Sequence, residues 1–278
     1  EAAVYHYDIF DKDSQKRLAR RLGLPIAEDY IANVPLADAL AYVERTGLER
    51  FVIKPNSSRS SIGCHTFVRV DGLYLDIRTG RRLCFAELEP TLRAETIKGR
   101  KDVWLVEELL LPVDGSLTMI GDYKMYCIGG KVELIFYKRP LVGKQKYRRH
   151  WYTKDWDHVT PGQKVHPPRT FAPINGARLI EFAGAASSRL CYPFIRLDLY
   201  DTDRGIVLGE FTPGPGGAYS FNVEWNPYLV RRYHEAATAI AEGIRTGRIV
   251  PLGPDPEPAT TTPEPATTTP EPATTAAA

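Results

Sequence analysis

The sequence predicts an α+β fold made of antiparallel hairpins and few helices. Three observations lead to this class: several short segments alternate apolar and polar residues, turns that contain glycine join neighbouring segments, and four segments have the wider spacing of amphipathic helices. The 278 residues are 43% hydrophobic and 25% charged. This composition is ordinary for one large globular domain or two small ones.

Local signals predict the elements of the first half. Residues 11–23 are expected to form a helix, because an acidic start is followed by Leu18, Ala19 and Leu22 on one face and then by Gly23 as a stop. The other elements expected in this half are a helix at 36–46, a strand at 51–55, a polar loop at 56–63, a returning strand at 64–70 and a mostly apolar strand at 103–111.

The second half is expected to contain two hairpins and two helices. The segment DYKMYCIGGKVELIFYKR, residues 122–139, alternates in period two around the turn IGGK. A second hairpin is expected in RLDLYDTDRGIVLGEFT, residues 196–212, where two apolar runs flank DTDRG. Helices are expected at 175–190 and at 224–247, and the second of these is long and amphipathic.

The turn of the second hairpin determines how its strands pair. A three-residue turn at 203–205, with glycine last, is expected to pair Thr202 with Ile206. Counting outward from this pair places Asp198 directly opposite Glu210, with Cβ atoms about 5 Å apart. A two-residue turn would break this pairing.

The two facing carboxylates predict a cation site. Like charges at this separation repel, so a positive group is expected between Asp198 and Glu210. Oxygen ligands on rigid strands suit Mg²⁺, which usually takes one or two carboxylates together with substrate phosphates. Arg196, which the same pairing sets opposite Thr212, and the glycine-rich exit at 214–217 crowd the same place. They favour a metal site over a solvent-facing sheet edge with a tolerated acid pair.

A lysine followed by a hydroxyl-rich loop predicts phosphate contacts. Lys54 ends the expected strand at 51–55, and four serines follow it. Backbone N–H and serine O–H groups can donate to phosphate while the lysine supplies charge, although the loop lacks the pattern GxxxxGK[ST] and an ordinary polar turn is the alternative. Lys12, at the start of the first helix, joins this site only if it points at the same phosphates; otherwise it is a surface lysine. The four serines are Ser57, Ser58, Ser60 and Ser61.

Two acids interrupt the apolar run at 103–111. Glu107 and Glu108 follow strand-forming residues and precede two leucines. Carboxylates inside such a run are costly unless they are exposed or hydrogen-bonded. A purine amino group and an exposed sheet edge are equally compatible with the local pattern.

A basic segment with interspersed aromatic residues follows the first hairpin, at 138–156. It is expected to be a loop that closes over the cleft and contacts an anionic ligand, and a solvated basic loop is the alternative. Aromatic residues among bases also suit nucleic acid, but the rest of the chain is too weakly basic, so no nucleic-acid partner is expected. The bases are Lys138, Arg139, Lys144, Lys146, Arg148, Arg149 and Lys154.

The C-terminal segment 254–278 differs in kind from the rest. Its repeat of Pro, Glu, Ala and Thr has no apolar residues large enough to bury a core, which predicts a disordered tail. The tail carries four acids and no base, so the net charge of +2 becomes about +6 for the preceding residues, which suits an anionic ligand. The four cysteines fit neither a zinc pattern nor a dense disulfide framework, and no stretch has the roughly 18 apolar residues of a membrane span. A cytoplasmic protein is expected.

Taken in order, these motifs resemble the ATP-grasp superfamily. The pair Asp11–Lys12 is similar to its first phosphate lysine motif, Lys54 to its second, VEELL to its adenine hinge and RLD…GEFT to its metal hairpin. Within the superfamily, DYKMYCIGGKVELI, RRHWYTKDWD and FIRLDLYDTDRGIVLGEFTPGPGG are most similar to the TupA-like branch, named for teichuronopeptide biosynthesis. The resemblance covers roughly residues 11–235. It implies an ATP-grasp fold, with two α+β subdomains, 1–110 and 111–253, that hold ATP between antiparallel sheets.

The resemblance implies roles for the residues at matching positions. Lys12 and Lys54 would bind ATP phosphates. Glu107 would contact the adenine amino group, and the backbone of Glu108 and Leu110 would complete the hinge.

The same resemblance assigns the metal and the transferring group. Asp198 and Glu210 would hold Mg²⁺, and Thr212 stands where most of the superfamily has asparagine as a third metal residue. Arg196 would stabilise the transferring phosphate or acyl phosphate. Two further residues are expected near the phosphates, Lys124 and Arg139.

The implied activity is ATP-dependent ligation of a carboxylate to an amine, on a peptide, an amino acid or a cell-envelope glycan. The carboxylate would form an acyl phosphate that the amine then attacks. Neither His150 nor His234 has a partner pattern for a catalytic dyad, which agrees with a reaction that needs no protein nucleophile. A kinase that uses the same ATP site with a hydroxyl acceptor is one alternative, although the sequence offers no obvious spare carboxylate as its base. A non-catalytic nucleotide-binding module is the other.

Overall fold

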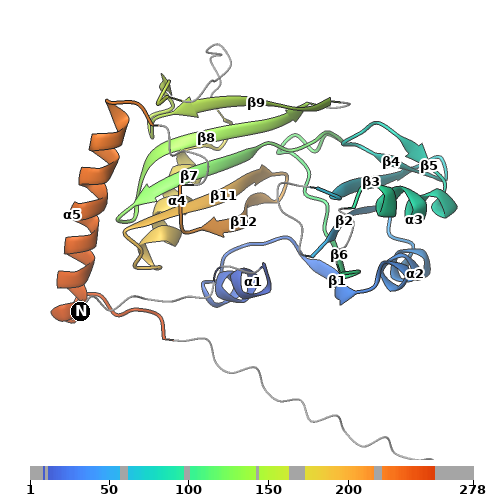
Figure 1. The fold of residues 1–278 in the computed structure, drawn as a ribbon, viewed down its shortest axis with the longest axis horizontal. Coiled ribbons are helices and arrows are strands. Elements are labelled where there is room, and N and C mark those ends of the chain that lie inside the picture. Colours follow the sequence, from blue (N-terminus) through green and yellow to red (C-terminus); the bar gives the residue numbers. More distant parts are fainter. Residues whose placement is uncertain are drawn as a thin grey trace, which may run out of the picture.

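The computed structural model describes residues 9, 12–56, 62–96, 101–141, 144–162, 173–215 and 221–253. Five helices and twelve strands lie in these ranges, and the strands form two six-stranded sheets in which all pairings between named strands are antiparallel (Figure 1). The α+β prediction is therefore confirmed. Among the helices described, none combines the length and apolarity needed to cross a membrane.

The first sheet is built mainly from residues of the first 107 positions. Its strand order is β1-β6-β2-β3-β4-β5, and α2 and α3 pack against it around a core that includes Phe51, Phe67 and Trp104. The strands are β1 (Asp29–Val34), β2 (Arg50–Pro55), β3 (His65–Val70), β4 (Leu73–Asp76), β5 (Arg82–Leu83) and β6 (Trp104–Glu107), and the helices are α2 (Leu36–Thr46) and α3 (Phe85–Ala94).

The second sheet has the order β10-β9-β8-β7-β11-β12. Helix α4 packs on one face of it, and α5 lies along the other, where Trp225 and Leu229 contact a smaller core around Trp151. The strands are β7 (Asp122–Ile128), β8 (Lys131–Leu141), β9 (Lys144–Tyr152), β10 (His158–Val159), β11 (Phe194–Thr202) and β12 (Gly205–Thr212), and the helices are α4 (Gly176–Ser188) and α5 (Trp225–Arg245).

Helix α1 (Lys12–Arg21) packs with the second sheet, although it precedes the first one in the chain. Leu18, Ala19 and Leu22 are buried in the core of the second sheet, and the Gln15 side chain accepts a hydrogen bond of 2.9 Å from the backbone N–H of Phe211 on β12. In Figure 1, α1 lies between β12 and β1, beside both sheets. The subdomain boundary at 110/111 stays a prediction, but its first segment contributes this helix to the core of the other half.

The β11–β12 hairpin has the predicted acid pair but a different turn. Thr202 pairs with Gly205, so the turn has two residues and not the three that the sequence suggested. A β-bulge next to Asp198 then adds one residue to β12, which restores the predicted pairing of Asp198 with Glu210. The bulged residue is Gly209, where an added Cβ would lie 2.5 Å from the Tyr200 ring. Glycine is needed here because Tyr200 packs directly over the backbone.

The prediction of a loop at 138–156 is wrong. Most of this segment belongs to β8 and β9, which pair as an antiparallel hairpin with Lys138 opposite Arg149 and Arg139 opposite Arg148. The ladder satisfies the backbone of the segment, and Trp151 and Tyr152 are buried in the two cores of the second half. Two of the aromatic residues among the bases, Trp151 and Tyr152, are therefore core positions of β9.

Candidate active site

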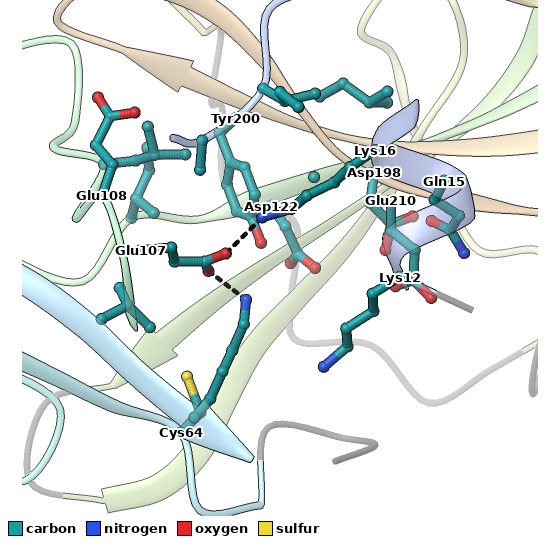
Figure 2. Close-up of a pocket in the computed structure, with 18 of the residues that line it drawn as sticks. Lys12, Gln15, Lys16, Cys64, Glu107, Glu108, Asp122, Asp198, Tyr200 and Glu210 are labelled. Atoms are coloured by element: carbon teal, nitrogen blue, oxygen red, sulfur yellow. Dashed lines mark hydrogen bonds and ion pairs between the residues drawn. The ribbon is translucent and has the colours of Figure 1, made fainter. Parts of the chain in front are cut away.

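A cavity of about 1120 Å³ is lined by residues of both sheets and of α1 (Figure 2). A cleft between two layers that gathers polar groups from many elements is the usual setting of a small-molecule site. Ten residues that the sequence singled out line this cavity: Lys12, Lys54, Glu107, Glu108, Leu110, Lys124, Arg196, Asp198, Glu210 and Thr212.

The β11–β12 hairpin presents one face to the cavity. Alternation along β11 puts Arg196, Asp198 and Tyr200 on the same side of the strand, and all three line the cavity. Asp198 is only 3% exposed, yet it is a carboxylate. Burial of such a group requires compensating cations, which the neighbouring strand and Asp198's own strand supply.

Two cations hold the Asp198 carboxylate. Arg196 donates from Nε to Oδ1 at 2.6 Å and from Nη2 to Oδ2 at 3.0 Å, and its Nη2 also donates to the Thr212 hydroxyl at 2.9 Å. Lys124, directly opposite Asp198 on β7, forms an ion pair with it and a second one of 2.6 Å with Asp122. Burial alone would lower the pKa of Lys124, but these two carboxylates outweigh it and raise that pKa.

Glu210 faces the same cavity across the strand pair. Partial burial raises its pKa, and the nearby negative charge of Asp198 raises it further. A carboxyl group in this situation gains from any cation that enters the cavity, because the cation offsets both effects.

The donor set of the hairpin suits a hard divalent cation. Asp198 and Glu210 offer carboxylate oxygens, and Thr212 offers a hydroxyl beside them. No group of three or more His, Cys, Asp and Glu side chains that could hold a metal occurs among the residues described. Mg²⁺ does not require such a cage, since it commonly takes one or two carboxylates and completes its shell with water and phosphate oxygens.

Glu107 lies at another part of the cavity wall, between two lysines. Lys54 on β2 and Lys16 on α1 both form ion pairs with it, the second at 3.0 Å between Nζ and Oε2. Burial opposes the charged form of Glu107, but the charges of Lys54 and Lys16 outweigh burial and lower its pKa. Figure 2 shows Glu107 and Lys16 pointing toward each other.

Lys12 begins α1 and points into the cavity (Figure 2). Burial lowers its pKa, and the nearby charge of Lys54 lowers it further. Two mutually repelling lysines at a cavity wall favour a bound anion, which would relieve the repulsion.

Glu108 and Leu110, for which the resemblance predicts a hinge role, differ in their contacts. The side chain of Glu108 turns to Arg204, with ion-pair distances of 2.8 Å and 2.7 Å, and its backbone N–H donates to the Glu28 carbonyl. The backbone N–H of Glu108 is therefore already engaged by Glu28. Leu110 follows on the cavity wall.

One residue of the predicted site lies elsewhere. Arg139 does not line the cavity; it is exposed on β8, whereas the preceding residue, Lys138, does line it. Neighbouring residues of a strand point to opposite faces, so only one of the two can face the ligand. The four serines of the phosphate loop, at 57–61, and the predicted tail at 254–278 lie outside the described residues.

Sequence reasoning gave no site role to several polar residues that line the cavity, among them Lys16, Asp122 and Tyr200. Simple periodicity would have found these three, since Lys16 stands one helical turn after Lys12 and Tyr200 lies two strand positions after Asp198. The same rule applies to Asp122, two positions before Lys124. Lys138, one of the seven bases that the sequence assigns to a loop, lines the cavity from β8, and its ammonium group lies 3.9 Å from the centre of the Tyr147 ring.

Comparisons with solved structures give distant likenesses at low identity. A D-alanine–D-alanine ligase from Helicobacter pylori has a TM-score of 0.44 and 14% identity, covering 84% of this chain and 60% of the ligase. A D-alanyl-alanine synthetase A from Vibrio cholerae has a TM-score of 0.47 and 15% identity, covering 84% and 66%. The VanG D-Ala:D-Ser ligase from Enterococcus faecalis has a TM-score of 0.46 and 13% identity, covering 84% and 62%. The chain thus spans less than two thirds of the length of these proteins.

The comparison with family models is more specific. No curated protein matches the chain. One family model, described as TupA-like ATPgrasp, matches residues 44–231, more than half of the chain. This range contains every strand of the second sheet and every predicted site residue except Lys12. The chain therefore belongs to the TupA-like ATP-grasp family and has the ATP-grasp fold.

Proposed function

We propose that this chain is an ATP-dependent ligase that joins a carboxylate to an amine. One observation carries the proposal: the facing carboxylates of Asp198 and Glu210, with Arg196 and Lys124 beside them, share one cavity with the lysine-flanked Glu107. A module that only binds a nucleotide would need Glu107 and its lysines. It would not need the Asp198–Glu210 pair with the cations beside it.

The nucleotide would lie with its base at Glu107 and its phosphates toward the metal hairpin. The Glu107 carboxylate and the carbonyl of Glu108 can accept from an adenine amino group, and Leu110 borders the same place. Lys12 and Lys54 are suited to the phosphates, because both line the cavity and a bound anion would offset the burial and the Lys54 charge that lower the pKa of Lys12. Lys54 would then leave its ion pair with Glu107 and bind a phosphate oxygen instead.

Asp198, Glu210 and Thr212 are the residues that would hold Mg²⁺. When bound there, the ion would neutralise charge on the phosphates and polarise the transferring group. Arg196 contacts both Asp198 and Thr212, so its guanidinium group is fixed next to the position of that group. Lys124 adds a second positive charge at the same position.

The reaction follows from these placements. A substrate carboxylate oxygen attacks the γ-phosphorus of ATP, the bond to the β-phosphate oxygen breaks, and an acyl phosphate and ADP result. The amine nitrogen then attacks the acyl carbon, the carbon–oxygen bond to phosphate breaks, and one proton leaves the nitrogen. The side chains around the cavity contribute positioning and positive charge, which are the main contributions a protein makes to phosphoryl transfer. The acceptor would be a peptide, an amino acid or a cell-envelope glycan.

A kinase is the second candidate, and one observation favours it. Asp122 lines the cavity beside Lys124, and burial raises its pKa. This is the spare carboxylate that a hydroxyl acceptor would need as a base. Arg196 and Lys124 would stabilise phosphoryl transfer to a carboxylate or to a hydroxyl group. The identity of the acceptor therefore distinguishes a ligase from a kinase.

Oxygen labelling distinguishes these functions. The chain is incubated with Mg²⁺, ATP and pools of amino acids and peptides whose carboxylates carry ¹⁸O, and the released phosphate is analysed by mass spectrometry. A ligase transfers one labelled oxygen from the carboxylate to the released phosphate. A kinase releases no phosphate and leaves a phosphoester, and ADP release without label transfer from any pool would contradict the ligase.

A further inference from the structure

Lys16 forms ion pairs with two carboxylates that lie opposite each other on neighbouring strands of the first sheet. Asp29 on β1 and Glu107 on β6 are directly opposite in the strand pairing. Lys16 reaches both from α1, with an ion pair to Asp29 and one of 3.0 Å to Glu107. The three side chains are 10–20% exposed, so water screens their charges only in part. Without the lysine, two largely buried like charges would repel.

Lys16 differs from Lys54, the other lysine on Glu107. Lys54 approaches the opposite carboxylate oxygen, Oε1, and is the lysine that the proposed function assigns to phosphate. Once it turns to a phosphate, Lys16 is the ion-pair partner that remains on Glu107. Asp29 fixes the ammonium group of Lys16 from the other side, so Lys16 need not follow the nucleotide.

The charge state of Glu107 decides which base it can accept. A carboxylate only accepts hydrogen bonds, whereas a protonated carboxyl group also donates one. Adenine presents an amino donor at position 6, and guanine presents a carbonyl acceptor there. A site built around a fixed acceptor rejects a base that offers a second acceptor, because two acceptors are then left facing each other.

We propose that Lys16 is a positioning residue that keeps Glu107 aimed and acceptor-only, and so sets the preference of the cavity for a 6-amino purine over a 6-oxo purine. This inference rests on the proposed nucleotide site. It goes further by assigning base selectivity to a residue that need not touch the nucleotide. A purely structural role, in which Lys16 only ties α1 to the first sheet, would leave base selectivity unchanged.

The test measures dissociation constants for non-hydrolysable ATP and GTP analogues and for inorganic tripolyphosphate by calorimetry. Lys16→Met is compared with Lys16→Arg, which retains the charge, and with Arg20→Met. Arg20 is a matched control, because it lies one turn further along α1 and contacts Asp29 at 3.5 Å but has no contact with Glu107 among those resolved. Melting temperatures establish that each variant is folded, and Lys16→Gln replaces Lys16→Met if the latter is not.

The wild-type chain is expected to prefer the ATP analogue, and Lys16→Met to reduce that preference about tenfold with tripolyphosphate binding unchanged. Lys16→Arg and Arg20→Met should retain the preference. A folded Lys16→Met variant with undiminished preference overturns this inference while the nucleotide site stands. Wild-type protein that binds neither analogue overturns the proposed function as well.

Discussion

At the scale of single residues, the cavity is a set of charges that hold one another in place. Asp198 is buried because Arg196 and Lys124 compensate it, and Glu107 is buried because Lys54 and Lys16 do. Such pairs contribute little net stability, but removing one partner leaves an uncompensated buried charge. The groups that would bind substrate are thereby fixed before substrate arrives.

Glu107→Gln should lower the free energy of unfolding by about 3 kcal/mol at pH 7, because two lysines lose their counter-charge. The pKa of Glu107 is lowered in the folded state, so its contribution is present above the ordinary Glu pKa of about 4.3 and is lost as pH falls below it. Urea titrations of the wild type and Glu107→Gln from pH 7 to pH 3 should therefore give free energies of unfolding that converge as the pH falls.

Glu89→Gln is the matched control for that measurement. Glu89 pairs with Arg93 on α3, but both side chains are nearly half exposed. Loss of this ion pair should lower the free energy of unfolding by no more than about 0.5 kcal/mol. Equal costs for the two variants would contradict the view that the Glu107 ion pairs are buried.

The residues of the site were only partly predictable. Asp198, Glu210, Lys54 and Glu107 stand out because an acid or base within an apolar run is unusual. Lys16 resembles any surface lysine of an amphipathic helix, and only the packing of α1 beside β1 and β6 gives it two carboxylate partners.

At the scale of elements, the β11–β12 hairpin positions the site through a bulge. The sequence predicted the pairing of Asp198 with Glu210 correctly but from the wrong turn. The error arose because a two-residue turn and a bulge together give the same outer register as a three-residue turn. Neither alternation nor turn composition can separate the two, since the bulge depends on Tyr200 packing over Gly209.

Gly209→Ala should therefore damage the site more than a change at the turn. The added Cβ would meet the Tyr200 ring at 2.5 Å, which should cost about 2 kcal/mol of stability and shift Glu210 out of register. Gly205→Ala strains a residue at φ +106° but meets no neighbour within 4 Å. ADP release per folded molecule should fall sharply in the first variant and persist in the second; equal activity in both would mean that the bulge does not position Glu210.

Other elements were predictable in proportion to their local signals. Helix α2 occupies the predicted residues 36–46, with Gly47 in the left-handed conformation at its end. Strand β9 was missed, because its bases and aromatic residues resemble a binding loop when the neighbouring strand is unknown. Strand β1 was also missed, and its burial pattern lacks the alternation on which the prediction of strands relied.

At the scale of the whole molecule, α1 connects the two halves. Its apolar side belongs to the core of the second sheet, and its polar side presents Lys12 and Lys16 to the cavity. Lys16 reaches β1 and β6 of the first sheet from there. The sequence predicted this helix but not its place, because its contacts with Phe211 and Glu107 join residues more than 80 positions apart.

The central claim is that this cavity binds ATP with a divalent cation at Asp198 and Glu210. Calorimetry with a non-hydrolysable ATP analogue, with Mg²⁺ and with excess chelator, tests it most directly on wild-type protein, Glu210→Gln and the distant exposed control Glu44→Gln. The account predicts binding that Mg²⁺ strengthens at least about tenfold in wild type and Glu44→Gln, and a loss of that Mg²⁺ effect in Glu210→Gln. An equal Mg²⁺ effect in all three proteins, or no binding by the wild type, would contradict it.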